Sequence, residues 1–169
     1  MESYIRNATT EDAEDLALIY SKSFHSAFKG IISDEFLDEK FSYERLKGRL
    51  SEEVSKGTPI NSIMVIDDIA VGMVTYTDSK NEENDSLEAE IWRIYLLPEY
   101  WNQNIGMELM EWSLKDLEAK GYKKVSLWVI EENVRARRFY EKFGFEHDGK
   151  IRVINVGREI KDYRYIKYL

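Results

Sequence analysis

The segment 87–130 constrains the fold of this chain most, because it has the pattern of strand, turn, helix and strand in succession. Residues 87–97, LEAEIWRIYLL, have the composition of a strand that Pro98 ends. Residues 105–120 place leucine and methionine at helical spacing. Residues 123–130, KKVSLWVI, are apolar on both sides, which predicts a strand in the buried centre of a sheet. A unit of this order is typical of α/β proteins.

Further elements are expected on both sides of this unit. Three helices precede residue 58, a hairpin follows them, and one helix and two strands end the chain. The expected elements are strand 3–8, helices that begin near Thr10, Ser33 and Tyr43, strands 60–66 and 69–77 joined at Asp67-Asp68, a polar, flexible loop at 78–86, helix 133–143, and strands 145–155 and 159–168. The order β-α-α-(α)-β-β-β-α-β-α-β-β predicts one α/β domain over residues 1–169 with a mixed sheet.

The composition limits the partners of the chain. Its 24 basic and 32 acidic residues give a formal net charge of −8, which argues against unselective binding of nucleic acid and favours cationic partners. The chain has no cysteine, so thiolate nucleophiles are excluded, and its two histidines argue against a His-rich zinc site, so we expect no metal. The first residues lack the features of a signal peptide, and no apolar run approaches the roughly 20 residues that span a bilayer, so we expect a cytoplasmic protein without membrane contact.

The charge is unevenly distributed along the chain. Residues 78–90 contain six acidic residues and one lysine, whereas residues 120–142 contain seven basic and three acidic residues. This separation indicates either two ligands of opposite charge or ordinary solvated helix faces. The charge pattern alone leaves both interpretations open.

The turn over residues 97–107, LPEYWNQNIGM, leads from a strand into a helix. The first backbone N–H groups of a helix lack intrahelical partners and lie at its positive end, which suits a phosphate or pyrophosphate. Asn102 and Asn104 tolerate the left-handed backbone, and Gly106 allows a ligand to approach closely. The segment lacks the GKS or GKT ending of a Walker loop and the G-x-G-x-x-G of a dinucleotide-binding loop. By itself it is also compatible with an ordinary turn.

A second segment is more specific. Residues 133–145, NVRARRFYEKFGF, resemble the N-x-x-A-x-x-F-Y-x-x-x-G-F signature of the GNAT superfamily of acyl-CoA-dependent N-acetyltransferases. Residues 101–106 are similar to the family's Q/R-x-x-G-x-G/A pyrophosphate loop, and residues 89–98 to its fourth strand. The two patterns occur in the family's order and at its usual spacing. The resemblance implies a GNAT-like fold, with a mixed, mostly antiparallel sheet of about seven strands flanked by helices.

Two phrases resemble the PaiA-like polyamine acetyltransferase branch of this superfamily, namely residues 28–38, FKGIISDEFLD, and residues 94–100, IYLLPEY. The chain departs from the family in the loop, because Trp101 stands where Gln or Arg is usual and Asn104 where Gly is usual. Asn can adopt the required backbone, so N–H groups can still face a pyrophosphate. Trp101 cannot donate hydrogen bonds as Arg does.

The resemblance implies direct attack of an amine on the thioester of acetyl-CoA, without a covalent enzyme intermediate. Tyr140 falls on the family's tyrosine and is the candidate acid, since a phenol with a pKa of about 10 is protonated at neutral pH. Glu90 is the candidate base, directly or through water, and by period-2 alternation it shares a strand face with Leu96. Glu88 shares that face and is the second candidate. Both carboxylates could instead be solvated residues beside a polar loop.

The resemblance also implies ligand-binding residues. Acetyl-CoA is expected to contact strand backbone groups, loop N–H groups and cationic helix residues. The cofactor candidates are Ile94, Tyr95, Leu96, Gln103, Asn104, Ile105, Gly106, Met107, Asn133, Tyr140 and, for the adenosine phosphates, Arg137, Arg138 and Lys142. The acceptor site of the family lies between the first two helices and the fourth strand, which gives His25, Phe28, Tyr76 and Trp92 as acceptor candidates. Asn133 can also cap its helix.

Three functions remain open. The leading one is an acetyl-CoA-dependent N-acetyltransferase that acts on a small cationic amine such as a polyamine. The second is an enzyme of the same fold that acts on protein N-termini or lysines. The third is a non-catalytic acyl-CoA-binding module, which Trp101 and Asn104 favour and Glu90 and Tyr140 oppose. The resemblance is compatible with a homodimer.

Overall fold

The computed structural model describes residues 2–78 and 87–169, and seven strands of this part form one mixed sheet. The strands are β1 (Ser3–Asn7), β2 (Ile60–Ile66), β3 (Ile69–Asp78), β4 (Glu88–Leu96), β5 (Lys124–Ile130), β6 (Glu146–Asn155) and β7 (Glu159–Tyr168). The helices are α1 (Ala13–Phe28), α2 (Asp34–Lys40), α3 (Tyr43–Lys56), α4 (Ile105–Ala119) and α5 (Val134–Lys142), with 3-10 turns at Thr10–Asp12 and Pro98–Tyr100. The predicted fold class and element order are confirmed.

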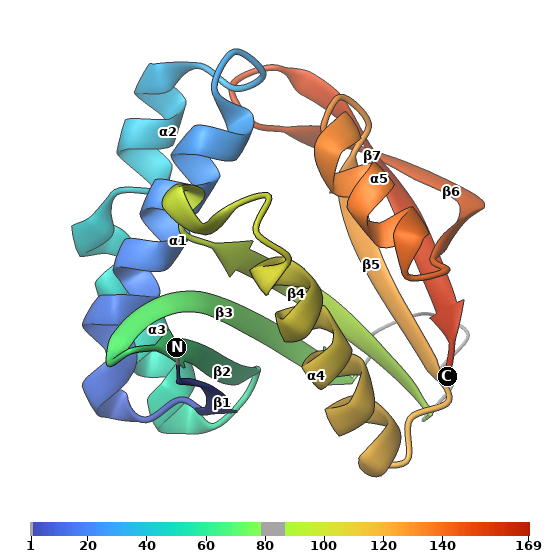
Figure 1. Cartoon of the computed structure of the whole chain (residues 1–169). Coiled ribbons are helices and arrows are strands. Elements are labelled where there is room, and N and C mark those ends of the chain that lie inside the picture. Colours follow the sequence, from blue (N-terminus) through green and yellow to red (C-terminus); the bar gives the residue numbers. More distant parts are fainter. Residues whose placement is uncertain (1, 79–86) are drawn as a thin grey trace.

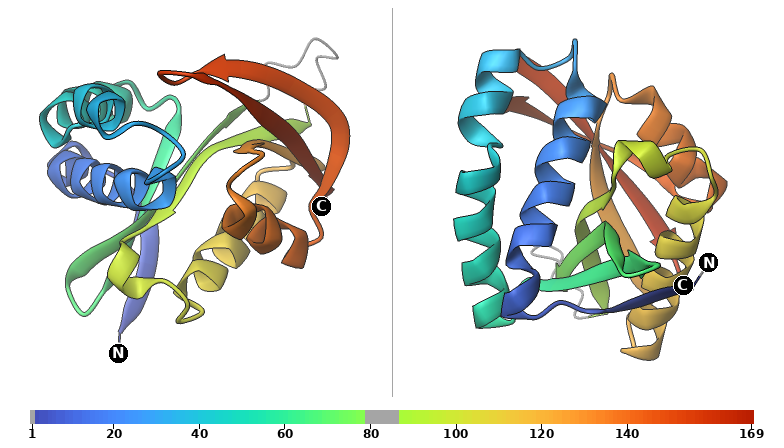
Figure 2. Two further views of the ribbon diagram at one scale, coloured as in Figure 1. Left: turned by 90° about the horizontal axis from the view of Figure 1, so that it is seen from above. Right: turned by 60° about the vertical axis from the view of Figure 1, so that its left-hand side comes forward.

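The sheet has the order β1-β2-β3-β4-β5-β7-β6, and each described pair is antiparallel except β4 with β5. Helices α1 to α3 cover one face, and α4 and α5 cover the other (Figures 1 and 2). Strand β5 lies between β4 and β7, as its apolar sequence predicted. Two apolar cores result, one under each helical layer.

Local turn chemistry explains why the chain reverses where it does. Asp67 and Asp68 join β2 to β3 and both have positive φ values, 47° and 65°. A two-residue turn with two left-handed residues matches the right-handed twist of an antiparallel hairpin. The predicted hairpin is therefore confirmed, whereas the predicted polar loop 78–86 lies, from residue 79 onward, outside the described residues. In the described part, no helix has the length and apolar character to cross a membrane.

Candidate active site

The candidate active site lies where β4 and β5 separate. Residues 88–91 pair in parallel with residues 124–127, and beyond them β5 continues along β7 alone. Figure 1 shows the two strands diverging toward the top of the view. The second half of β4 therefore has a strand partner on one side only, among the strands that the structure describes.

This edge exposes some β4 backbone groups and hides others. The Leu97 N–H donates a hydrogen bond to β3 at 2.8 Å. Because residues of an antiparallel strand alternate in the direction of their backbone groups, Tyr95 also bonds toward β3, whereas Ile94 and Leu96 face the gap. Of the three β4 residues predicted to contact acetyl-CoA through their backbone, Ile94 and Leu96 are therefore the two with suitable backbone orientation.

The Leu96 carbonyl is already used inside the protein. It accepts hydrogen bonds from the Ser23 hydroxyl at 2.8 Å and from the Trp101 indole N–H at 2.7 Å. A carbonyl with two lone pairs is then fully satisfied. Ligand contacts from this strand therefore depend on both backbone groups of Ile94 and on the Leu96 N–H.

A β-bulge interrupts β4 beside the gap. Thr75 of β3 pairs with Arg93, but the next residue, Tyr76, pairs with Ile91, so Trp92 is the additional residue. A bulge of this kind bends its strand and breaks the alternation of side chains. Trp92 is exposed as a result.

The bulge determines the position of Glu90. The core beneath α4 contains Ile91, which precedes the bulge, and also Ile94 and Leu96, which follow the bulge. Ile91 and Ile94 share this face although they lie an odd number of residues apart. Glu90 therefore lies on the opposite face from Leu96, beneath α1 and α3. The expectation that Glu90 and Leu96 share a face was wrong, because simple alternation does not allow for the inserted residue.

Glu90 borders a pocket of about 330 Å³ on the α1–α3 face. The pocket receives side chains from α1, α3, β4, β5 and β6, so it is assembled from most of the chain. Its lining residues are Tyr20, Arg49, Glu90, Ile91, Trp92, Arg93, Trp128 and Arg152. The mixture of aromatic, cationic and acidic groups suits a polar ligand.

The two candidate bases have different environments. Burial raises the pKa of Glu90, an effect that the nearby Arg152 and Arg164 oppose. A raised carboxylate pKa brings a general base closer to neutral pH. Glu88 is only 1% exposed, and its carboxylate lies 3.0 Å from the Lys124 ammonium. Glu90 is therefore the better placed of the two to exchange protons with a ligand in the pocket.

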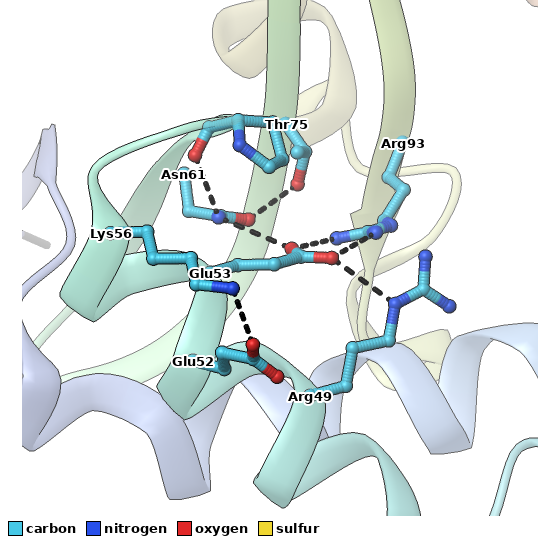
Figure 3. A network of polar contacts seen from close by, with 8 residues as sticks. Arg49, Glu52, Glu53, Lys56, Asn61, Thr75 and Arg93 are labelled. Carbon is cyan, nitrogen blue, oxygen red and sulfur yellow. Dashed lines mark hydrogen bonds and ion pairs between the residues drawn. The ribbon is translucent and has the colours of Figure 1, made fainter.

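A buried polar network supports the pocket from the α3 side (Figure 3). The Arg93 guanidinium donates two hydrogen bonds to Glu53, at 2.7 and 2.8 Å, and Arg49 donates a third through Nε at 3.1 Å. Burial would raise the pKa of Glu53, but its hydrogen bonds and charge interactions with Arg93 lower it overall. The Asn61 amide contacts Glu53 at 3.5 Å and accepts a bond from Thr75 at 2.6 Å. The network joins α3 to β2, β3 and β4.

A second ion pair borders the pocket from the β6–β7 side. Arg152 donates to Asp162 through Nε at 2.8 Å, and its second nitrogen contacts the same oxygen at 2.7 Å. The Arg152 guanidinium also lies 4.2 Å from the centre of the Trp128 ring. Asp162 is buried, and this burial raises its pKa while Arg152 opposes the shift.

Tyr140 is positioned by α5 on the other side of the gap. Its half-buried ring packs edge-to-face against Phe139 and Phe145, with centroids 5.7 and 6.0 Å away. Burial raises the pKa of the phenol, and the Asp162 carboxylate raises it further, so the group stays protonated at neutral pH. In the described part of the chain, no residue forms a hydrogen bond with this hydroxyl. The phenol is therefore available as a proton donor to a ligand.

The predicted pyrophosphate loop has the backbone that its asparagines indicated. Asn102 and Asn104 have φ values of 60° and 65°, both left-handed. The Gln103 side chain turns back and donates to the Glu99 carbonyl at 2.7 Å, so it braces the loop. Asn104 can thus replace the glycine that is usual in the family.

The N-terminus of α4 lies directly after this loop. The Met107 N–H bonds to the Asn104 carbonyl at 3.1 Å, whereas Ile105 and Gly106 precede the first intrahelical donors. A Cβ at Gly106 would lie 3.6 Å from the Phe139 ring, an ordinary van der Waals distance, so the start of α4 lies close to α5. Left-handed turn residues, free helix N–H groups and this glycine together fit a pyrophosphate.

The polar residues of α5 have separate roles. The Asn133 side chain accepts from the Ala136 N–H at 3.2 Å and caps the helix. Arg137 donates to the Tyr165 hydroxyl at 3.0 Å and to the Glu131 carbonyl at 3.1 Å, which fixes it within the protein. Arg138 and Lys142 are exposed, so they remain candidates for phosphate contacts.

The acceptor candidates are only partly brought together. Trp92 lines the pocket beside Glu90. His25 joins α1 to α2 through Asp38 at 3.0 Å, and Phe28 is buried in the core beneath α1. Tyr76 faces the opposite core, where its hydroxyl donates to Asp116 of α4. His25, Phe28 and Tyr76 are thus absent from the pocket lining.

Six pocket residues were not among the candidates from the sequence, namely Tyr20, Arg49, Ile91, Arg93, Trp128 and Arg152. Tyr20, Arg49 and Arg152 come from elements that are distant in sequence from β4, so no local motif connects them. Trp128 lies in a central strand, where aromatic residues are common, so its sequence context alone does not indicate a site. Arg93, the other missed cation, lies within a strand whose apolar composition predicts a paired and buried charge.

The free edge of β4 and the loop before α4 are the features expected of a CoA-dependent acyltransferase, and comparison with known proteins shows this class. The model of the acetyltransferase (GNAT) family matches residues 19–145. The chain belongs to this family and is an N-acetyltransferase. The family uses acetyl-CoA.

Individual relatives support this assignment. The spermidine N(1)-acetyltransferase of Thermoplasma acidophilum is 29% identical over 153 residues, which covers 86% of this chain and 89% of the relative. An uncharacterised N-acetyltransferase of Archaeoglobus fulgidus is 30% identical over 140 residues, with 80% and 88% covered. The crystal structure of the PaiA N-acetyltransferase of Thermoplasma acidophilum with coenzyme A aligns over 100% of both chains, with a TM-score of 0.78 and 25% identity.

Proposed function

We propose that this enzyme transfers the acetyl group of acetyl-CoA to a primary amine, with Glu90 as the base and Tyr140 as the acid. One observation carries the assignment of roles. Glu90 and Tyr140 come from opposite faces of the sheet, yet the Asp162 carboxylate contributes to the raised pKa of each. Both groups therefore lie within the electrostatic range of the Asp162 carboxylate, and Glu90 lies near the end of the stretch over which β4 pairs with β5.

The chemistry divides between the two residues. Acetyl-CoA supplies a thioester carbonyl that a neutral amine can attack directly. Glu90 accepts the proton that the amine nitrogen loses, directly or through one water molecule. Tyr140 gives its phenolic proton to the sulfur as the C–S bond breaks, and it recovers a proton from solvent. The Ile94 backbone and the α4 N-terminus orient the cofactor through hydrogen bonds.

A polyamine is the first candidate for the acceptor. The exposed Trp92 ring lines the pocket with aromatic surface, which attracts ammonium groups, and Glu90 adds a carboxylate. The likeness to a spermidine N(1)-acetyltransferase supports the same acceptor class. The pocket also admits a second candidate, because the Arg49 and Arg152 side chains are about half exposed. Guanidinium groups favour an acceptor that carries a carboxylate, such as an acidic peptide with a free N-terminus.

One panel of amines separates these possibilities. Purified protein is incubated with acetyl-CoA and with spermidine, spermine, a diamine, a free amino acid, a lysine peptide or an acidic peptide, and the released thiol is measured. Highest kcat/KM with a polyamine supports the first candidate, and highest kcat/KM with a peptide supports the second. Binding of CoA without turnover of any amine would instead indicate the non-catalytic module.

A further inference from the structure

Trp101 forms a rigid platform at the start of the pyrophosphate loop. Its indole N–H donates to the Leu96 carbonyl at 2.7 Å, which ties one edge of the ring to the end of β4. The half-buried ring packs against the core beneath α4. One hydrogen bond and one packed surface therefore fix the orientation of the indole.

Arg135 of α5 lies on the face of this platform. Its guanidinium carbon is 3.8 Å from the centre of the Trp101 ring, a close cation–π contact. Partial burial lowers the pKa of Arg135, but the guanidinium stays charged. Within residues 2–78 and 87–169, no carboxylate forms an ion pair with it. Arg135 is thus a positioned cation whose hydrogen-bond donors remain available.

The Arg135 guanidinium lies on the side of α5 that faces the α4 N-terminus. Trp101 begins the loop that leads into α4, and Phe139, one helical turn after Arg135, faces Gly106 at that N-terminus. The side of α5 that carries Arg135 therefore borders the same N–H groups that fit a pyrophosphate. Arg138 and Lys142 continue the charge along α5 at spacings of three and seven residues.

We infer that Arg135, held in place by Trp101, is a ligand of the CoA pyrophosphate in this enzyme. Trp101 occupies the loop position at which the family pattern has Gln or Arg. The loop has lost that side-chain donor, and α5 supplies the positive charge in its place through the stacked guanidinium. The inference rests on the proposed use of acetyl-CoA; it assigns a binding role to Arg135 and a positioning role to Trp101.

Calorimetric titration with CoA, 3′-dephospho-CoA and pantetheine tests this inference. Arg135→Ala should weaken CoA and 3′-dephospho-CoA by the same factor, about tenfold, because a charge-assisted contact to the pyrophosphate is lost. The same variant should change the affinity for pantetheine by less than about twofold, since pantetheine has no phosphate. Arg45→Ala, which removes an exposed arginine from α3, is the matched control and should leave all three affinities unchanged.

A rescue variant separates charge from folding. Trp101→Arg combined with Arg135→Ala places the cation back in the loop, and it should recover most of the CoA affinity that Arg135→Ala loses. Melting temperatures confirm that each variant is folded. An equal loss with pantetheine, or a loss with CoA that is absent with 3′-dephospho-CoA, would overturn the pyrophosphate assignment.

The result also distinguishes this inference from the proposed function. Wild-type binding of CoA together with an unchanged Arg135→Ala variant would refute the role of Arg135 and leave the acetyltransferase assignment intact. No binding of CoA by the wild-type protein would refute both.

Discussion

Replacing Glu53 by Gln should destabilise the protein strongly, because it leaves a buried arginine without its carboxylate. Arg93 is only 4% exposed, and its two hydrogen bonds to Glu53 measure 2.7 and 2.8 Å. The Tyr20 ring, 5.2 Å away, is a poor substitute for a carboxylate. Removal of one partner from a buried ion pair typically costs about 3–5 kcal/mol.

This cost predicts a large shift in thermal unfolding. For a chain of this size, about 1 kcal/mol corresponds to a change of roughly 2–4 °C in melting temperature, so Glu53→Gln should melt roughly 6–20 °C below the wild type. Differential scanning calorimetry or circular dichroism at one protein concentration measures this difference.

The neighbouring residue provides a matched control. Glu52 pairs with Lys56 on the exposed side of α3, and both side chains are more than half exposed. Glu52→Gln should therefore leave the melting temperature nearly unchanged, since exposed pairs contribute little. Equal melting temperatures for the Glu53 and Glu52 variants would show that the Arg93 pair is not a stabilising feature of the pocket.

Three further variants test the site. Tyr140→Phe should lower kcat by about 10²- to 10⁴-fold while CoA affinity measured by calorimetry stays within a few-fold, and unchanged kinetics would remove Tyr140 from the mechanism. Glu90 must lose its proton to act as a base, and its pKa is raised, so kcat/KM should rise with pH through an inflection above the ordinary glutamate pKa of about 4.3. Glu90→Gln should abolish that inflection. An inflection that persists in the variant would have to be assigned to another group. Tyr76→Phe should leave the KM for the amine unchanged, because the hydroxyl bonds to Asp116 beneath α4, and a raised KM would return Tyr76 to the acceptor site.

The elements that could be predicted from the sequence are those that local chemistry determines. Asp67 and Asp68 predicted a hairpin, and they adopt left-handed backbone because their short polar side chains tolerate it. Asn102 and Asn104 predicted the loop backbone for the same reason. The apolar pattern of residues 123–130 predicted a central strand because both faces of that strand are covered.

The parts that could not be predicted depend on register and on tertiary contacts. A bulge is a mismatch between two strands, and neither strand alone shows where Trp92 will be inserted. The position of Glu90 therefore required the pairing of β3 with β4. Arg49 and Arg152 enter the pocket from strands and helices more than 40 residues away from Glu90, which no spacing rule within one segment can indicate.

In the structure, the cations of the basic segment 120–142 divide into those that bond to other described residues of the protein and those that do not. Several of its cations serve the protein itself, since Lys124 pairs with Glu88, Lys120 pairs with Asp116, and Arg137 bonds to Tyr165. The cations without an ion pair inside the described part include three that follow one another along α5, namely Arg135, Arg138 and Lys142. Positive charge beside the loop is thus concentrated on one helix. In the function we propose, this helix lets an acidic chain bind a polyanionic cofactor at that face, while Glu90 faces the amine on the opposite face of the sheet.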